Sequence, residues 1–284
     1  MPMGKRSCVI TLPSSWLQEQ GLAAGDVAAV EVEGNVVIIS SKASKKLRSF
    51  SADVRSVHTM LHRFLGALYK AGFDDVTLTV EPKQIKIIEE VLKRSLVGFE
   101  LVKIKASTVH IQRIAELDSL DIDTLVKQLF FSLQVMNEEL IAAVDKQDKG
   151  LLADVIKKDD NINRLADSAR RLLNKQKGDC IVYAFVEQLE NIGDAYKNLA
   201  LSCIERPRRV SREGLELLQR LLKRIYLLYY AFSLKELEGF GKAAKEAESE
   251  LHEQKDLLPL YTQIFDIHGL AITKSISSYK EEKI

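Results

Sequence analysis

Three acidic residues, Glu187, Glu190 and Asp194, are spaced i, i+3, i+7 in a stretch that suits a helix. At 100° per residue, this spacing gathers the carboxylates on one side of the helix. The apolar residues of the same stretch fall on the opposite side: Phe185, Leu189, Ile192, Tyr196 and Leu199. Carboxylates held this close repel one another, and a bound cation relieves the repulsion.

A second acidic stretch lies earlier in the chain, where an apolar stripe is accompanied by Asp159, Asp160, Asn163 and Asp167. We expect the two stretches to be adjacent antiparallel helices that bring these side chains together. Carboxylate and amide oxygens suit Mg²⁺, Mn²⁺, Ca²⁺ or iron. The alternative is a solvated acidic face whose charges are paired by the basic residues nearby: Lys157, Lys158, Arg164 and Lys197.

Two histidines, His58 and His62, are spaced i, i+4 in a predicted helix, and this spacing can hold a metal ion. Neither an HExxH pattern nor a nearby carboxylate supports such a site, so packing or surface roles are favoured. The sequence has no Ser/His/Asp or Cys/His pattern of a nucleophilic enzyme. We therefore predict no catalytic activity.

Composition indicates a soluble globular protein of two or three domains, with 284 residues, 46% hydrophobic and 29% charged. The formal net charge is +1, so any binding to nucleic acid or membrane must be local. The three cysteines have no zinc-ligand spacing, which favours a reducing compartment and buried apolar roles. No run of 18 apolar residues is present. We predict a cytoplasmic protein that does not insert into a membrane.

The N-terminal part, residues 1–45, reads as strands at 7–12, 27–32 and 36–40, with a short helix at 16–20. A unit of about 40 residues is too small to bury a good core alone, so we predict a homodimer through it. The basic stretch 42–49 follows. It is either a solvated linker or a contact to nucleic-acid phosphates.

Residues 50–115 alternate helix and strand and predict a small α/β module. The expected elements are helices at 53–71 and 82–96 and strands at 76–80, 99–105 and 109–113. Neither a glycine-rich phosphate loop nor a nucleophile elbow is present in this module.

Residues 117–284 read as helical throughout. The expected helices lie near 121–146, 150–176, 180–205, 211–238, 240–254 and 256–279. Six helices of this length suggest two antiparallel three-helix bundles, so the predicted fold class is multidomain and mainly α. The last third also reads as a degenerate copy of the helices before it, with Glu190 over Asp266, Gly193 over Gly269, and Asp194 over Leu270.

The segments Val155-Ile-Lys-Lys-Asp-Asp-Asn-Ile-Asn-Arg-Leu165 and Leu189-Glu-Asn-Ile-Gly-Asp-Ala195 closely resemble the two signature segments of PhoU proteins. The resemblance implies paired three-helix bundles that bind a metal such as Fe, Mg, Mn or Zn through E(D)-x-x-x-D motifs. The ligands it implies here are Glu187, Glu190, Asp194, Asp159 and Asn163.

The family motif is altered at two places in this chain. Asn163 stands where the family has Asp, and an amide oxygen is a neutral, weaker ligand. In the second repeat Leu270 replaces the motif Asp, although Glu246 and Glu250 keep an acidic spacing. The resemblance thus implies one metal site and a second that is weakened or lost.

The N-terminal stretch Gly4-Lys-Arg-Ser-Cys-Val-Ile-Thr-Leu-Pro13, followed by Trp16 and a hairpin, resembles a SpoVT-AbrB domain. In that family two chains interleave their hairpins into a DNA-binding dimer. Basic side chains neutralise DNA phosphates, which dominates affinity. The candidate DNA-binding residues are Lys5, Arg6, Lys42, Lys45, Lys46 and Arg48.

The order of the parts, a swapped hairpin at 1–45, an α/β module at 50–115 and PhoU-like helices at 117–284, is similar to archaeal PhoU-like phosphate uptake regulators. This resemblance implies a phosphate-response transcriptional regulator that binds DNA and controls phosphate uptake and homeostasis. The alternative is a signalling module that binds and restrains the ATPase of a phosphate ABC transporter without touching DNA.

Overall fold

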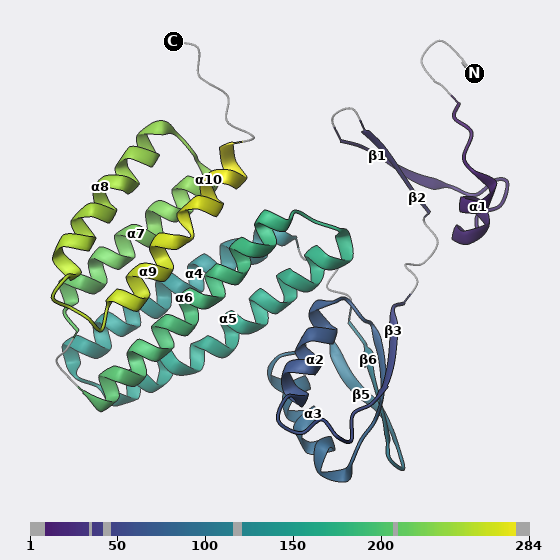
Figure 1. Ribbon diagram of the computed structural model, residues 1–284, viewed down its shortest axis with the longest axis horizontal. Helices are drawn as coiled ribbons and strands as arrows, with labels where there is room; N and C mark the ends of the chain where they lie inside the picture. Colours follow the sequence, from purple (N-terminus) through teal and green to yellow (C-terminus); the bar gives the residue numbers. More distant parts are fainter. Residues whose placement is uncertain (1–8, 34–35, 42–46, 116–120, 207–209, 277–284) are drawn as a thin grey trace. The chain divides into compact units, whose positions relative to one another are not determined.

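A computed structural model of the chain describes residues 9–33, 36–41, 47–115, 121–206 and 210–276 (Figure 1). The chain divides into two compact units, Met1–Leu47 and Arg48–Ile284. The second unit contains a four-stranded mixed sheet followed by a mainly helical part. A small N-terminal hairpin unit, an α/β module and a helical body therefore follow one another along the chain, in the predicted order.

The N-terminal unit contains α1 (Ser14–Gln20), β1 (Ala28–Glu33) and β2 (Val36–Ser41). Helix α1 ends at Gly21, whose φ of +66° is the left-handed conformation that glycine adopts at no steric cost. Strands β1 and β2 pair as an antiparallel hairpin. The predicted strand at 7–12 is wrong where it can be checked, because the described residues 9–12 belong to no strand.

The α/β module begins with β3 (Ser49–Asp53), α2 (Leu61–Lys70) and β4 (Asp75–Thr79), and continues with α3 (Pro82–Arg94), β5 (Phe99–Lys105) and β6 (Thr108–Arg113). The strand order is β3-β4-β6-β5, with β3 and β4 parallel and the other neighbours antiparallel. One face of the sheet, carrying Val76, Leu78, Val109 and Ile111, forms a buried core with the apolar sides of α2 and α3.

The predicted helix at 53–71 is wrong over its first eight residues. Residues 49–53 form strand β3, in which Phe50 and Ala52 turn inward and the backbone pairs with β4. Helix α2 starts only at Leu61, so His58 lies outside it. The supposed i, i+4 histidine pair on one helix therefore does not exist, and both His58 and His62 are exposed.

The helical part consists of α4 (Ile122–Lys146), α5 (Lys149–Gln176), α6 (Cys180–Glu205), α7 (Arg212–Tyr230), α8 (Leu234–Leu251), α9 (Leu258–Asp266) and α10 (His268–Ile276). The break between α7 and α8 falls at 231–233 rather than at Gly239, because Ser233 caps α8 by accepting the amide hydrogen of Glu236 at 3.1 Å. The predicted last helix, 256–279, is interrupted at Ile267.

The helices share one continuous apolar core. Within it, the buried Asn137 of α4 donates to the Tyr196 hydroxyl of α6 at 2.8 Å and to the Leu215 carbonyl of α7 at 3.2 Å. This amide joins the first three helices to the ones that follow. Among the described residues, no helix is both long and apolar enough to cross a membrane.

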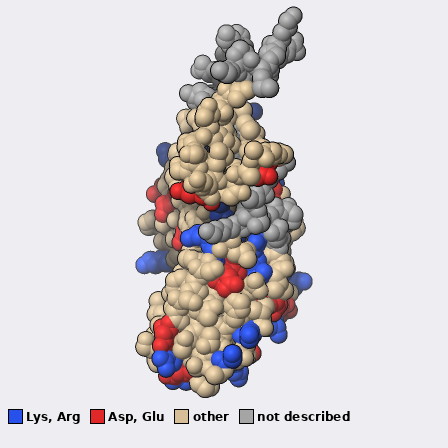
Figure 2. Space-filling model, turned by 90° about the vertical axis from the view of Figure 1, so that its right-hand side faces the viewer, with Lys and Arg blue, Asp and Glu red and all other residues tan. Residues whose placement is uncertain are grey.

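Charged residues of both signs are mixed on the face of the molecule drawn in Figure 2. On the face drawn in Figure 2, Lys and Arg alternate with Asp and Glu and do not gather into one patch. The free cysteines Cys180 and Cys203 differ in burial. Cys203 has the predicted buried role, whereas Cys180 is exposed at the start of α6.

Candidate functional site

The predicted acidic residues of α5 and α6 do come together. Glu187, Glu190, Asp194 and Asn163 line one cleft of about 710 Å³, and Asp159 is buried beside Asn163. The other wall of the cleft is formed by α2 and α3 of the α/β module. The cleft thus lies between the module and the helical body, inside the second unit.

Apolar packing turns the acids of α6 toward this cleft. The opposite stripe of α6 is buried in the core: Phe185, Leu189, Ile192, Tyr196 and Leu199. Gly193 lets α5 approach closely, because a Cβ on it would lie only 2.8 Å from Cγ2 of Ile162. The acids of α5 and α6 are therefore held against each other across a narrow helix–helix contact.

Lys197 of α6 joins two of the predicted metal ligands. Its Nζ donates to Asp159 at 2.6 Å and to Asp194 at 2.5 Å. Asp159 also accepts a hydrogen bond from the amide of Asn163 at 3.0 Å. Burial alone would lower the pKa of Lys197, but its hydrogen bonds to the two carboxylates outweigh burial and raise that pKa.

Arg170 of α5 joins the other predicted ligands. The guanidinium donates to Glu187 at 2.6 Å and to Asp167 at 3.0 Å, and lies 3.6 Å from Glu190. Its side chain is only 4% exposed. Burial would lower the pKa of Arg170, but the three carboxylates raise it, so the group stays charged.

Burial dominates the carboxylates at the bottom of this cleft. It raises the pKa values of Asp159, Asp167 and Glu190, although basic neighbours act in the opposite direction. Asp159 and Asn163 also each keep one buried side-chain oxygen with no hydrogen-bond partner among the described residues.

The contacts decide whether these residues, as they stand, suit the metal that the resemblance implies. All five predicted ligands are already bonded to Lys197, to Arg170 or to each other. Within the described ranges, no group of three or more His, Cys, Asp or Glu residues is arranged to hold a metal ion. The donor set does not fit a metal in this arrangement, and metal binding stays a prediction.

The acidic residues of the second repeat lie on the surface. Asp266, Glu246 and Glu250 are all exposed, and Glu246 pairs with Arg220 at 3.1 Å. Gly269, which the repeat aligns with Gly193, has no atom within 4 Å of the position that a Cβ would take. The second copy therefore lacks the close helix contact that the first copy has.

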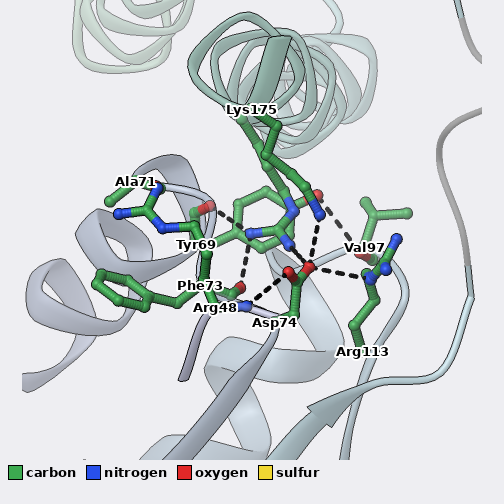
Figure 3. A network of polar contacts seen from close by, with 9 residues as sticks. Arg48, Tyr69, Ala71, Phe73, Asp74, Val97, Arg113 and Lys175 are labelled. Carbon is green, nitrogen blue, oxygen red and sulfur yellow. Dashed lines mark hydrogen bonds and ion pairs between the residues drawn. The ribbon is translucent and has the colours of Figure 1, made fainter. Parts of the chain in front are cut away.

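A second polar cluster surrounds Asp74, which lies between α2 and β4 (Figure 3). Its buried carboxylate lies 2.6 Å from Arg171, 2.7 Å from Lys175 and 3.0 Å from Arg113. Arg171 also donates to the carbonyls of Tyr69 and Phe73. Because Arg171 and Lys175 belong to α5, this cluster fixes the α/β module to the helical body.

Arg48, a candidate DNA-binding residue, belongs to the same cluster. Its backbone amide donates to Asp74 at 3.3 Å, and its carbonyl accepts from the amide of Asp74 at 2.7 Å. Its guanidinium donates to the Ala71 carbonyl at 2.5 Å and lies over the Phe73 ring. Arg48 thus anchors the start of β3, and a DNA contact by it stays a prediction. The other candidates, Lys5, Arg6, Lys42, Lys45 and Lys46, lie outside the described residues.

Sequence reasoning missed Arg170, Arg171 and Asp74 as organising residues. The two arginines lie between Ala169 and Leu172, two positions of the apolar stripe of α5. A helix that faces solvent on only one side buries residues at such positions. Two adjacent charged residues on the buried side of a predicted helix were the signal for an ion-pair network. No such signal marks Asp74, whose partners in α5 are about 100 residues away.

No family model, no curated protein and no solved structure matches this chain.

Proposed function

We propose that this chain is a phosphate-response regulator of the PhoU type that works as a homodimer through its N-terminal unit and has no catalytic activity. Three features support the proposal: the order of hairpin unit, α/β module and helical body, the two PhoU-like segments on α5 and α6, and the apolar surface of the hairpin. In this proposal the hairpin is of the swapped SpoVT-AbrB kind, and α4–α6 form the first three-helix bundle. The second bundle consists of α7, α8 and the interrupted third helix α9–α10.

The proposed dimer is supported by the exposed apolar face of the hairpin. Val32 lies opposite Val37, and Val30 lies opposite Ile39, so these side chains share one face of the hairpin. Val30, Val32 and Val37 are 60%, 69% and 56% exposed. None of the residues of this unit whose burial the structure describes is buried. An apolar β face of this kind is stable in water only when another surface covers it, and a second copy supplies one.

DNA binding by this unit depends on its predicted basic residues. The charged residues within its described part are all acidic: Glu19, Asp26, Glu31 and Glu33. Positive charge must therefore come from Lys5, Arg6 and the basic stretch 42–48. Because a dimer doubles these charges, dimerisation and DNA binding belong together in this proposal.

The alternative function is restraint of a phosphate ABC transporter through its ATPase, without DNA binding. The mixed charges of the described surface would then serve protein contacts. A strain that lacks this chain separates the two functions. If the chain is a transcriptional regulator, the strain that lacks it should keep expressing phosphate-uptake genes in high phosphate. If the chain regulates the transporter, the strain should show unchanged transcript levels and increased phosphate uptake. If neither changes, the proposed function is wrong.

DNA binding is tested in vitro by titration at increasing salt. We expect affinity for the DNA upstream of the protein's own gene to fall steeply as salt rises. This affinity should be lost in the double variant Lys5→Ala plus Arg6→Ala. The matched control is Lys103→Ala plus Lys105→Ala, which removes two exposed lysines from β5. Equal binding by both double variants would contradict the DNA-binding part of the proposal.

The dimer is tested by sedimentation of Val32→Lys plus Val37→Lys. We expect the wild type to sediment as a dimer and this variant as a monomer, because two charges would be buried at the covered face. The control is Ile104→Lys, which places a lysine at a half-exposed apolar position on β5. It should leave the sedimentation mass unchanged. A dimeric hairpin variant would show that the contact lies elsewhere.

A further inference from the structure

The acidic cluster of α5 and α6 contains two cationic side chains of its own. Five carboxylates belong to it: Asp159, Asp167, Glu187, Glu190 and Asp194. Arg170 and Lys197 lie among them and contact all five. Each basic side chain does for these acids what a bound cation would do, since it removes their mutual repulsion.

Lys197 takes a bridging position between the two helices. Its ammonium lies within 2.6 Å of Asp159 on α5 and 2.5 Å of Asp194 on α6. Two carboxylates from facing helices are the donors that a bridging metal ion would use. A second cation placed there would meet the fixed positive charge of the lysine at close range.

Arg170 takes the corresponding position toward the other end of the cluster. It reaches Asp167 on its own helix and both Glu187 and Glu190 on α6. A guanidinium cannot lose its proton near neutral pH, so its charge is permanent. Since the side chain is almost completely buried, it cannot move aside into solvent without rearrangement of the helices.

The charge of the cluster matches these two residues. Asn163 is neutral at the position where the resemblance predicts a carboxylate. Lys197, on the neighbouring helix α6, bonds to the same carboxylate as Asn163, that of Asp159. One negative charge is absent and one positive charge is present. Both features reduce the need for a metal at the same place.

We propose that Arg170 and Lys197 replace the metal in this chain, so that the acidic cluster is a permanent ion-pair network that joins α5 to α6 without a metal ion. This inference rests on the contacts and on the resemblance that predicts a metal here, and it holds whether or not the chain responds to phosphate.

The test restores the carboxylate and removes the lysine in one variant, Asn163→Asp plus Lys197→Ala. Asp159 and Asn163 already carry buried oxygens without partners, so this variant supplies three carboxylates with no competing cation. Mn²⁺ is the probe, measured by calorimetry and by elemental analysis of the full-length protein. We expect no stoichiometric Mn²⁺ on the wild type and binding at least roughly 100-fold tighter in the variant.

The control makes the same change of charge elsewhere on α5. Asn161→Asp plus Lys157→Ala alters a part-buried amide and an exposed lysine that pairs with Asp154. It should bind Mn²⁺ no better than the wild type. Melting followed by circular dichroism gives a second readout: Mn²⁺ should raise the melting temperature of the cluster variant only.

Three results would overturn the proposal. The first is wild-type protein that carries one or more equivalents of metal and melts earlier when a chelator removes it. The second is a folded cluster variant that binds Mn²⁺ no better than the wild type, since the lysine would then not be what excludes the metal. If the double variant does not fold, the single variant Lys197→Met is tested in its place. The third result is a folded Lys197→Met variant that binds Mn²⁺ no better than the wild type.

Discussion

The carboxylate of Asp74 accepts hydrogen bonds from the backbone of Arg48 and from three basic side chains, and it is almost completely buried. Burial would raise its pKa, but the bonds from Lys175 and Arg48 outweigh burial and hold that pKa below the ordinary value of 3.8. A single ionised group therefore neutralises several buried donors at the contact between the α/β module and α5.

We predict that Asp74→Asn lowers the free energy of unfolding by about 3–5 kcal/mol at pH 7, because it leaves buried cations without their counter-charge. Denaturant unfolding followed by circular dichroism measures the loss. Asp160→Asn removes an exposed partner of Arg94 and should cost at most ~1 kcal/mol. Equal losses in the two variants would mean that the Asp74 cluster is not a strong contact.

The pH dependence of this contact has a defined sign. Since the folded-state pKa of Asp74 lies below 3.8, its ionisation stabilises the fold above that pH, and the contribution is lost as the pH falls through the folded pKa. The difference in unfolding free energy between wild type and Asp74→Asn should therefore be full at neutral pH and shrink below pH 3.8. A difference that grows on acidification would contradict the assignment.

At the scale of helices, the spacing of α5 and α6 depends on Gly193. A methyl group there would lie 2.8 Å from Ile162, whose side chain is fully buried in the core. We predict that Gly193→Ala destabilises the protein by roughly 1–3 kcal/mol, even though alanine favours helix.

Gly241 of α8 is the matched control, because a Cβ there meets nothing within 4 Å. Gly241→Ala should stabilise the protein by about 0.5–1 kcal/mol through helix propensity alone. Opposite signs in thermal melts of the two variants are the expected result. A stabilising Gly193→Ala would show that the two helices are free to move apart.

The helices α4, α5 and α6 were predicted from the sequence to within one residue at each end, because each has a long apolar stripe and clear ends. The stretch 53–60 was not, since its apolar residues fit a helical period, whereas Asp53 ends strand β3 and residues 54–60 form the turns before α2. The acids of the cleft were also predictable from spacing. Their pairing with Arg170 and Lys197 was not, because it depends on how α5 and α6 face each other.

At the scale of the whole molecule, the two units should differ in how they unfold. The N-terminal unit has no buried residue among those whose burial the structure describes, whereas the helical part has a continuous core. If a second copy completes the N-terminal unit, its stability depends on protein concentration, and that of the helical part does not.

Trp16 makes this difference measurable, because it is the single tryptophan of the chain and lies in α1 of the N-terminal unit. We predict that the thermal transition seen by Trp16 fluorescence moves to higher temperature as protein concentration rises. The transition seen by circular dichroism at 222 nm, which the long helices dominate, should not move. Two transitions that move together would contradict independent units.

The contact between Asp74 and α5 also has a consequence for the time course of folding. Arg171 and Lys175 are 97 and 101 residues from Asp74 along the chain, so closing this contact requires a long loop to be ordered first. Local helix pairs form earlier, and the joint between module and body closes late. Asp74→Asn should therefore speed unfolding by far more than it slows refolding in stopped-flow denaturant jumps, and the joint acts mainly as a brake on opening.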